Sequence, residues 1–246
     1  MPVHDPIGEQ YLLLALRLDR HIPGFVDAYV GPARLKAAVL AEPPRPLTTL
    51  EEDAARLRDA VETADLEPDR RDYLTRQTLA MHTAARLRLG LKMSYRDEVK
   101  ALFDIRPEKT PESEFDRALR DVDTILPGKG DLARRQIAWR RRFELAAPAV
   151  LPVMARALRE VRRRTRSLFD LPRNEGVKLE VVTGQPWSGY NWYLGRGRSR
   201  VQINTDLPPR ANDALDFMAH EGYPGHHTEW MFKEKLLYQT ASRFDQ

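Results

Sequence analysis

The stretch 177–204, VKLEVVTGQPWSGYNWYLGRGRSRVQIN, decides the fold because the hydrophobic pattern changes there from helical to extended. Residues 177–182 alternate between apolar and polar and are rich in β-branched side chains, which predicts a strand. Residues 190–194 and 200–204 flank a Gly-Arg-Gly turn, which predicts a β-hairpin. The stretch therefore predicts a small antiparallel sheet.

The residues before this stretch follow a helical pattern. Apolar residues recur on one side of successive segments, and prolines and capping residues separate the segments. Thr49 with Glu52 forms a capping box, and Ser94 with Asp97 resembles another, so each pair predicts a helix N-terminus. The pattern becomes helical again from Asn212 onward. We therefore predict a mainly α protein, a multi-helix bundle with the small sheet inserted before the last helices.

The composition is that of a globular protein. Of the 246 residues, 42% are hydrophobic and 31% are charged. No cysteine is present, which excludes a disulfide scaffold, a thiol nucleophile and a cysteine-ligated metal. The first residues lack a signal-peptide layout, and their apolar run falls far short of the roughly 20 residues that span a bilayer. We predict a cytoplasmic location, no membrane partner, a helical domain over 1–170 and a second domain over 171–246.

Three of the six histidines lie within one short segment, HEGYPGHH at residues 220–227. The preceding residues, 213–219, predict an amphipathic helix. A His followed directly by Glu at the end of such a helix opens a zinc hydrolase motif, whose second His normally stands four positions after the first. Pro224 occupies that position here, so the usual form of the motif fails.

An unbroken helix would not bring two of these imidazoles to one metal ion. Positions six and seven residues apart are separated by about 9 and 10.5 Å along a helix axis, which is too far for two zinc–nitrogen bonds of about 2.1 Å. Pro224 disrupts the helix and Gly225 accepts backbone angles that other residues avoid. We therefore predict a break that brings His226 round to His220 on a zinc ion, with His227 as the alternative second ligand.

The His-Glu-x-x-Pro-Gly-His-His motif resembles that of the DUF885 family, bacterial zinc-dependent peptidases related to the gluzincin group. The similarity spans most of the chain and is most specific in Pro-Gly-His-His. Its other parts are residues 27–32, 94–99, 102–104, 126–128 and 201–206. The resemblance implies a peptide substrate and a general-base role for Glu221, which takes a proton from the attacking water.

The resemblance also implies a third zinc ligand, a Glu on a later helix, which this chain lacks. The acidic residues after the motif are Glu229, Glu234 and Asp245, and none has the family's downstream context. We interpret Glu229 and Glu234 as a solvated helix face. Because family members are longer, we expect this chain to be an N-terminal portion that is incomplete at its C-terminus and inactive as it stands unless another group completes the site.

Several aromatic and polar residues near the motif are further candidates. Tyr223 is a candidate catalytic donor to a developing oxyanion, and Tyr190 and Tyr193 are candidates for the same task or for substrate binding. The alternative is that the hairpin aromatics only pack the hairpin onto the helices. By analogy with zinc peptidases, residues 200–204, ending at Asn204, form a candidate edge strand that pairs with substrate.

Two other function classes remain as alternatives. Arginines are concentrated within residues 134–166, as in a nucleic-acid-binding helical protein, but Glu144, Glu160 and a net charge of only +4 argue against that partner. The missing third ligand favours a noncatalytic helical fragment as the other alternative.

Overall fold

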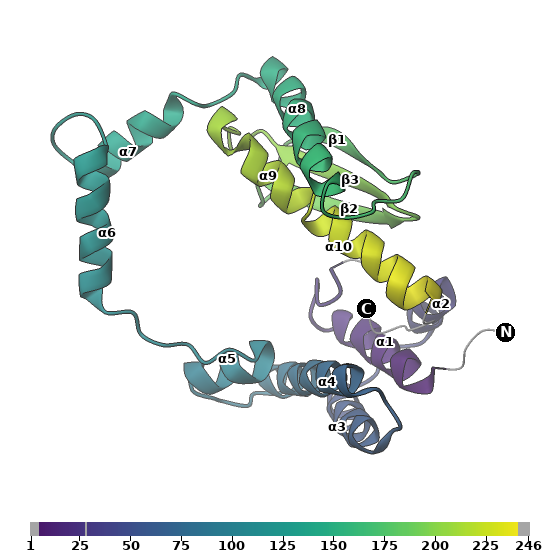
Figure 1. Ribbon diagram of the computed structural model, residues 1–246. Helices are drawn as coiled ribbons and strands as arrows, with labels where there is room; N and C mark the ends of the chain where they lie inside the picture. Colours follow the sequence, from purple (N-terminus) through teal and green to yellow (C-terminus); the bar gives the residue numbers. More distant parts are fainter. Residues whose placement is uncertain (1–4, 28, 241–246) are drawn as a thin grey trace. The chain divides into compact units, whose positions relative to one another are not determined.

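A computed structural model describes residues 5–27 and 29–240 of the chain (Figure 1). The chain divides into two compact units. One comprises Met1–Lys109 with Leu236–Gln246, and the other comprises Thr110–Lys235. None of the helices within the described residues is both long enough and apolar enough to cross a membrane.

The first unit is helical. Its helices are α1 (Pro6–Asp19), α2 (Ala33–Ala41), α3 (Leu47–Thr63), α4 (Pro68–Arg88) and α5 (Tyr95–Phe103). Ser94 caps α5 as predicted, because its Oγ accepts a hydrogen bond of 3.2 Å from the backbone N–H of Asp97. The predicted capping box at Thr49 is wrong, since α3 begins earlier, after Pro46, and has no side-chain cap.

The second unit contains the sheet and the remaining helices. Its elements are α6 (Glu112–Ile125), α7 (Leu132–Arg141), α8 (Ala147–Arg166), β1 (Gly176–Val182), β2 (Gly189–Gly195), β3 (Arg198–Asn204), a 3-10 turn (Ala211–Asp213), α9 (Ala214–Glu221) and α10 (His226–Lys233). A π-helical segment, Glu234–Thr240, follows α10, and from Leu236 onward its residues belong to the first unit. The prediction of a mainly α protein with a small sheet is confirmed.

The sheet is mixed rather than antiparallel. Its strand order is β1-β3-β2. The predicted hairpin is present as β2 and β3, whereas β1 lies parallel to β3, with Val181 opposite Ile203. The prediction of an antiparallel sheet is therefore wrong for β1, because the chain returns to place β3 in the centre. The edges of the sheet are β1 and β2, so residues 200–204 do not form an edge strand.

The core of this unit lies between the sheet and helices α8 and α9 (Figure 1). Its fully buried side chains include Val150 and Met154 of α8, Val201 and Ile203 of β3, and Met218 of α9. We predicted a domain boundary at 170/171, but α8 lies before that point and shares its core with the sheet. The division after Lys109 reflects this packing better.

Candidate functional site

The helix that carries the histidine motif breaks where Pro and Gly predict a break. Helix α9 ends at Glu221 and α10 begins at His226. The backbone N–H of Gly225 donates a hydrogen bond of 2.9 Å to the carbonyl oxygen of Ala219, which folds the connecting segment back on α9. The rings of His220 and His226 then meet edge to face, with centroids 4.7 Å apart and planes at 81°.

Both of these imidazoles are accessible for binding. His220 is exposed and His226 is half-buried. Neither ring has a hydrogen-bond partner among the residues that the structure describes. Imidazole nitrogens are donors of the type that zinc prefers.

Glu221 lies beside the two imidazoles and is largely withdrawn from water, with 7% of its surface exposed. Burial raises the pKa of its carboxyl, and the nearby His226 and His220 partly oppose that shift. A raised pKa brings a carboxylate closer to the range in which it can take and return a proton near neutral pH. Its backbone carbonyl oxygen accepts a hydrogen bond of 2.5 Å from Nδ2 of Asn191 on β2.

The donor set fits part of a zinc site. Within residues 5–27 and 29–240, no three His, Asp or Glu side chains converge in a way that could hold a metal ion. Glu229 forms an ion pair of 2.8 Å with Lys233, as expected on a solvated face. Glu234 does not lie on such a face, because it accepts hydrogen bonds from Tyr193 and Arg196. Asp245 lies outside the described residues.

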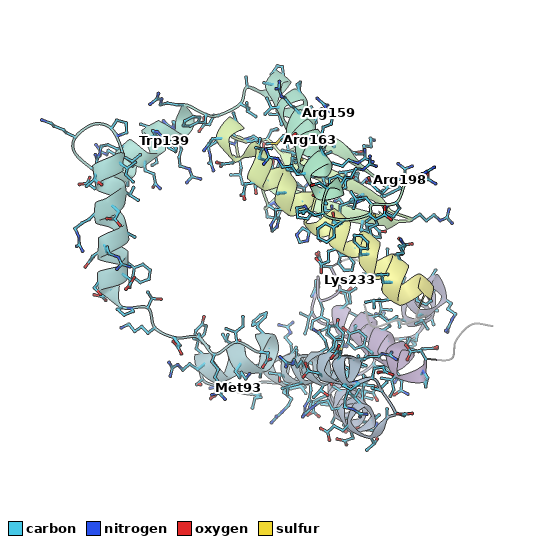
Figure 2. All side chains as sticks on the ribbon, viewed as in Figure 1. Met93, Trp139, Arg159, Arg163, Arg198 and Lys233 are labelled. Atoms are coloured by element: carbon cyan, nitrogen blue, oxygen red, sulfur yellow. The ribbon has the colours of Figure 1, made fainter. Side chains whose placement is uncertain are left out.

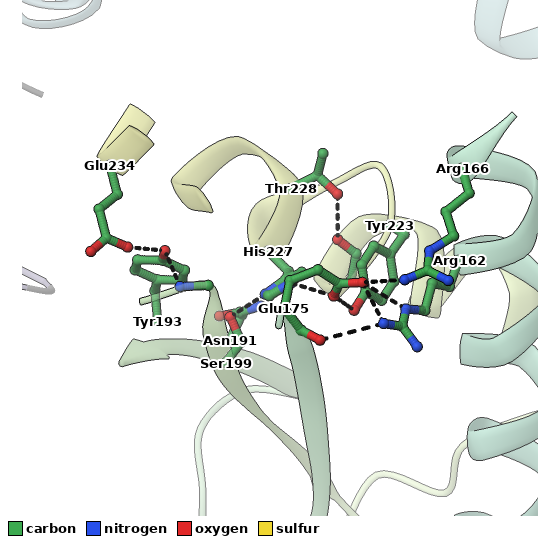
Figure 3. A network of polar contacts seen from close by, with 12 residues as sticks. Arg162, Arg166, Glu175, Asn191, Tyr193, Ser199, Tyr223, His227, Thr228 and Glu234 are labelled. Carbon is green, nitrogen blue, oxygen red and sulfur yellow. Dashed lines mark hydrogen bonds and ion pairs between the residues drawn. The ribbon is translucent and has the colours of Figure 1, made fainter. Parts of the chain in front are cut away.

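His227 is not placed as a metal ligand, so the alternative assignment is wrong for this structure. Its side chain has 0% exposure. Its Nε2 donates to Oε2 of Glu175 at 3.2 Å, and its Nδ1 accepts from Oγ of Ser199 at 2.8 Å. Because both ring nitrogens are occupied, the ring has no lone pair for a metal. Figure 3 shows it inside a network of polar contacts.

Tyr223 is likewise removed from the catalytic role predicted for it. It is only 1% exposed, and its hydroxyl donates to Oε2 of Glu175 (Figure 3). Burial and this hydrogen bond raise the pKa of Tyr223, so the hydroxyl stays protonated. A donor already bound to a buried carboxylate does not face a substrate.

Two of the three predicted substrate-binding residues stabilise the hairpin instead. Tyr193 is buried, and its hydroxyl donates to Glu234 and accepts from the backbone N–H of Gly197. Asn204 is fully buried, and its Nδ2 donates to two loop carbonyl oxygens at 2.9 Å each. Tyr190 is half-buried between Trp187 and Trp192, with ring centroids 5.6 and 4.6 Å away. Substrate binding by Tyr190 stays a prediction.

Sequence reasoning missed two polar residues next to the motif. Glu175, just before β1, is 4% exposed and forms ion pairs with Arg162 and Arg166 of α8. Asn191 is 9% exposed, and its Oδ1 has no hydrogen-bond partner among the described residues. Residues two positions apart in a strand lie on the same face of the sheet, so Asn191 lies on the face of Tyr193. This alternation could have identified Asn191 as a buried amide. No local signal marks Glu175.

The hydrogen bonds at Glu175 predict a specific acid sensitivity. Burial opposes its charge, but hydrogen bonds from His227, Tyr223 and Arg162 outweigh burial and lower its pKa from 4.5 to about 2. Because the folded pKa lies below the unfolded value, this carboxylate stabilises the fold fully above pH 4.5, by about 3 kcal/mol, and the stabilisation is lost as pH falls toward 2. Urea unfolding of the parent and Glu175→Gln should show a stability difference that shrinks over this range. A difference independent of pH would contradict it.

The remaining predicted features lie elsewhere. His21 contacts the carbonyl oxygen of Arg45 at 2.8 Å and His82 contacts Glu51 at 2.7 Å, while His4 lies outside the described residues.

Arg159 and Arg163 lie along α8 (Figure 2). Several arginines of the basic zone are ion-paired, namely Arg163 and Arg164 with Glu160, Arg162 and Arg166 with Glu175, and Arg135 with Asp123. A nucleic-acid partner stays an alternative prediction.

A scan against family models, a search of curated proteins and a search of solved structures each found no match. The resemblance of the motif to a peptidase family therefore stays a prediction.

Proposed function

We propose that this chain carries the histidine pair and the general base of a zinc-dependent hydrolase that cleaves peptide bonds. His220 and His226 would hold the zinc ion, and a group outside the described residues would complete its coordination. The observation that supports this best is the edge-to-face approach of the two rings at 4.7 Å across a broken helix. On a regular helix, two residues six positions apart would be separated by about 9 Å along the axis, too far to share one metal ion. The break between α9 and α10 allows the two imidazoles to approach each other despite this spacing.

The protein's own part of the chemistry is proton transfer by Glu221. Bound zinc supplies a water of lowered pKa. The carboxylate beside the two imidazoles accepts a proton from the attacking water and returns it to the departing amine nitrogen. Burial of this side chain, which raises its pKa, suits both halves of that task. The substrate class, a peptide, rests on the resemblance of the motif.

Zinc titration of histidine variants tests the proposal. We expect the parent to bind about one zinc ion per chain in calorimetry, and His226→Ala and His220→Ala each to lower the affinity at least about 100-fold. His82→Ala is the matched control, because it removes an imidazole that contacts Glu51 instead. A parent that binds no zinc, or a His226→Ala variant that binds as well as the control, would refute the metal site.

A further inference from the structure

One buried carboxylate joins the elements that surround the histidine pair. We propose that Glu175 is a positioning residue for this site, which clamps both ends of the segment 223–227 and thereby holds the ring of His226 against that of His220. The metal-binding part of this inference rests on the proposed function. The arrangement of the two rings does not depend on it.

The two oxygens of Glu175 have different partners (Figure 3). Oε2 accepts hydrogen bonds from the hydroxyl of Tyr223 and from Nε2 of His227. Oε1 accepts from Arg162 through Nε at 2.8 Å and through Nη2 at 2.5 Å. One oxygen therefore holds the motif segment and the other anchors the carboxylate to α8.

The positions of Tyr223 and His227 make this contact a clamp. The first precedes Pro224 and Gly225, and the second directly follows His226, so the break lies between two side chains bound to the same oxygen. Consecutive residues of a helix point about 100° apart. Fixing the ring of His227 on the buried side therefore also sets the direction of His226, about 100° round the helix from it.

The contacts of Glu175 with Tyr223 and His227, which form the clamp, are held in place because these side chains are buried. The side chains of Glu175 and His227 are 0% exposed. Ser199 of β3 donates to the second nitrogen of His227 at 2.8 Å, which fixes both its ring orientation and its tautomer. Satisfied polar networks in such an environment specify one arrangement of the side chains that they join.

The same residues do not form a nucleophilic site. Ser199, His227 and Glu175 follow the order of a hydrolase triad by residue type. Ser199 is only 3% exposed, however, so its hydroxyl does not reach a substrate. The network therefore acts on the neighbouring His226 rather than on a reacting group.

The test compares Glu175→Gln, Tyr223→Phe and a control, Val150→Ala. Val150 is fully buried in the same core, about three turns before Arg162 on α8, so its truncation loosens the unit without touching the clamp. The first measurement is the nuclear Overhauser effect between the rings of His220 and His226 in metal-free protein. We expect it in the parent and in Val150→Ala, and we expect it to be lost in Glu175→Gln and weakened in Tyr223→Phe.

The second measurement is cobalt(II) affinity, followed by the visible absorption of the bound ion. We expect a loss of about 10- to 100-fold in Glu175→Gln and no more than twofold in the control. If Glu175→Gln does not fold, Tyr223→Phe, which keeps the carboxylate and the buried ring, carries both measurements.

The outcomes separate the two proposals. An unchanged ring–ring effect in the clamp variants overturns the clamp, whether or not the parent binds metal. Equal losses in Val150→Ala and Glu175→Gln also overturn it, because general loosening then explains both. A parent that binds no metal but loses the ring–ring effect in Glu175→Gln refutes the proposed function and supports the clamp.

Discussion

Replacing Gly225 with alanine is expected to destroy the histidine pair. A Cβ at this position would overlap the carbonyl oxygens of His220 and Ala219, and backbone atoms cannot rotate away as a flexible side chain can. The turn must therefore open, which breaks the hydrogen bond from Gly225 to Ala219 and moves His226 away from His220. We expect a loss of about 3 kcal/mol in the free energy of unfolding and a loss of measurable zinc binding.

The control for this change is Gly184→Ala in the same unit. Gly184 has a φ of +69°, so alanine is strained there, but no atom lies within 4 Å of the added Cβ. Gly184→Ala should therefore cost about 1–2 kcal/mol through the backbone alone and leave zinc binding intact. Urea unfolding and zinc calorimetry on both variants decide the matter. If Gly225→Ala binds zinc as the parent does, the close approach at this turn is not needed for the pair.

The broken helix could be predicted because its causes are local. Pro224 and Gly225 carry their conformational preferences with them, and the six-residue spacing of His220 and His226 excludes a regular helix between two ligands. The two strands of the hairpin were predictable for the same reason, since their turn residues lie between them. Such short-range features can be predicted from the local sequence, without knowing what packs against the segment.

The environment of the motif could not be predicted because it is built by distant residues. Glu175 lies 48 residues before Tyr223 and 52 before His227 along the chain, yet it binds both. Whether a histidine in this motif faces an ion or a buried carboxylate depends on which side of α10 packs onto the sheet. The sequence alone therefore left His226 and His227 as alternatives.

The direction of β1 was not predictable for a related reason. Alternation identifies a strand and its two faces, but it does not say which neighbour the strand pairs with. Pairing with β3 rather than β2 makes β1 parallel and places β3 in the centre. This arrangement buries Asn204, the residue that an edge-strand prediction would have offered to substrate.

Once a further group completes the zinc coordination, changing Glu221 to glutamine is expected to lower peptide hydrolysis by about 100- to 10,000-fold while zinc stays bound. Glutamine has the same shape but accepts no proton, and His220 and His226 are unaltered. Because burial already disfavours the charged carboxylate, a neutral amide should not destabilise the fold. Glu229→Gln is the control, because Glu229 is exposed and forms an ion pair with Lys233 one turn further along α10. The activity of this variant should match the parent's. The measurement is cleavage of a mixed peptide library, read by mass spectrometry beside zinc calorimetry.

Hydrolysis by Glu221→Gln at the parent's rate would remove Glu221 from the mechanism, and loss of zinc in this variant would make Glu221 a ligand rather than a base.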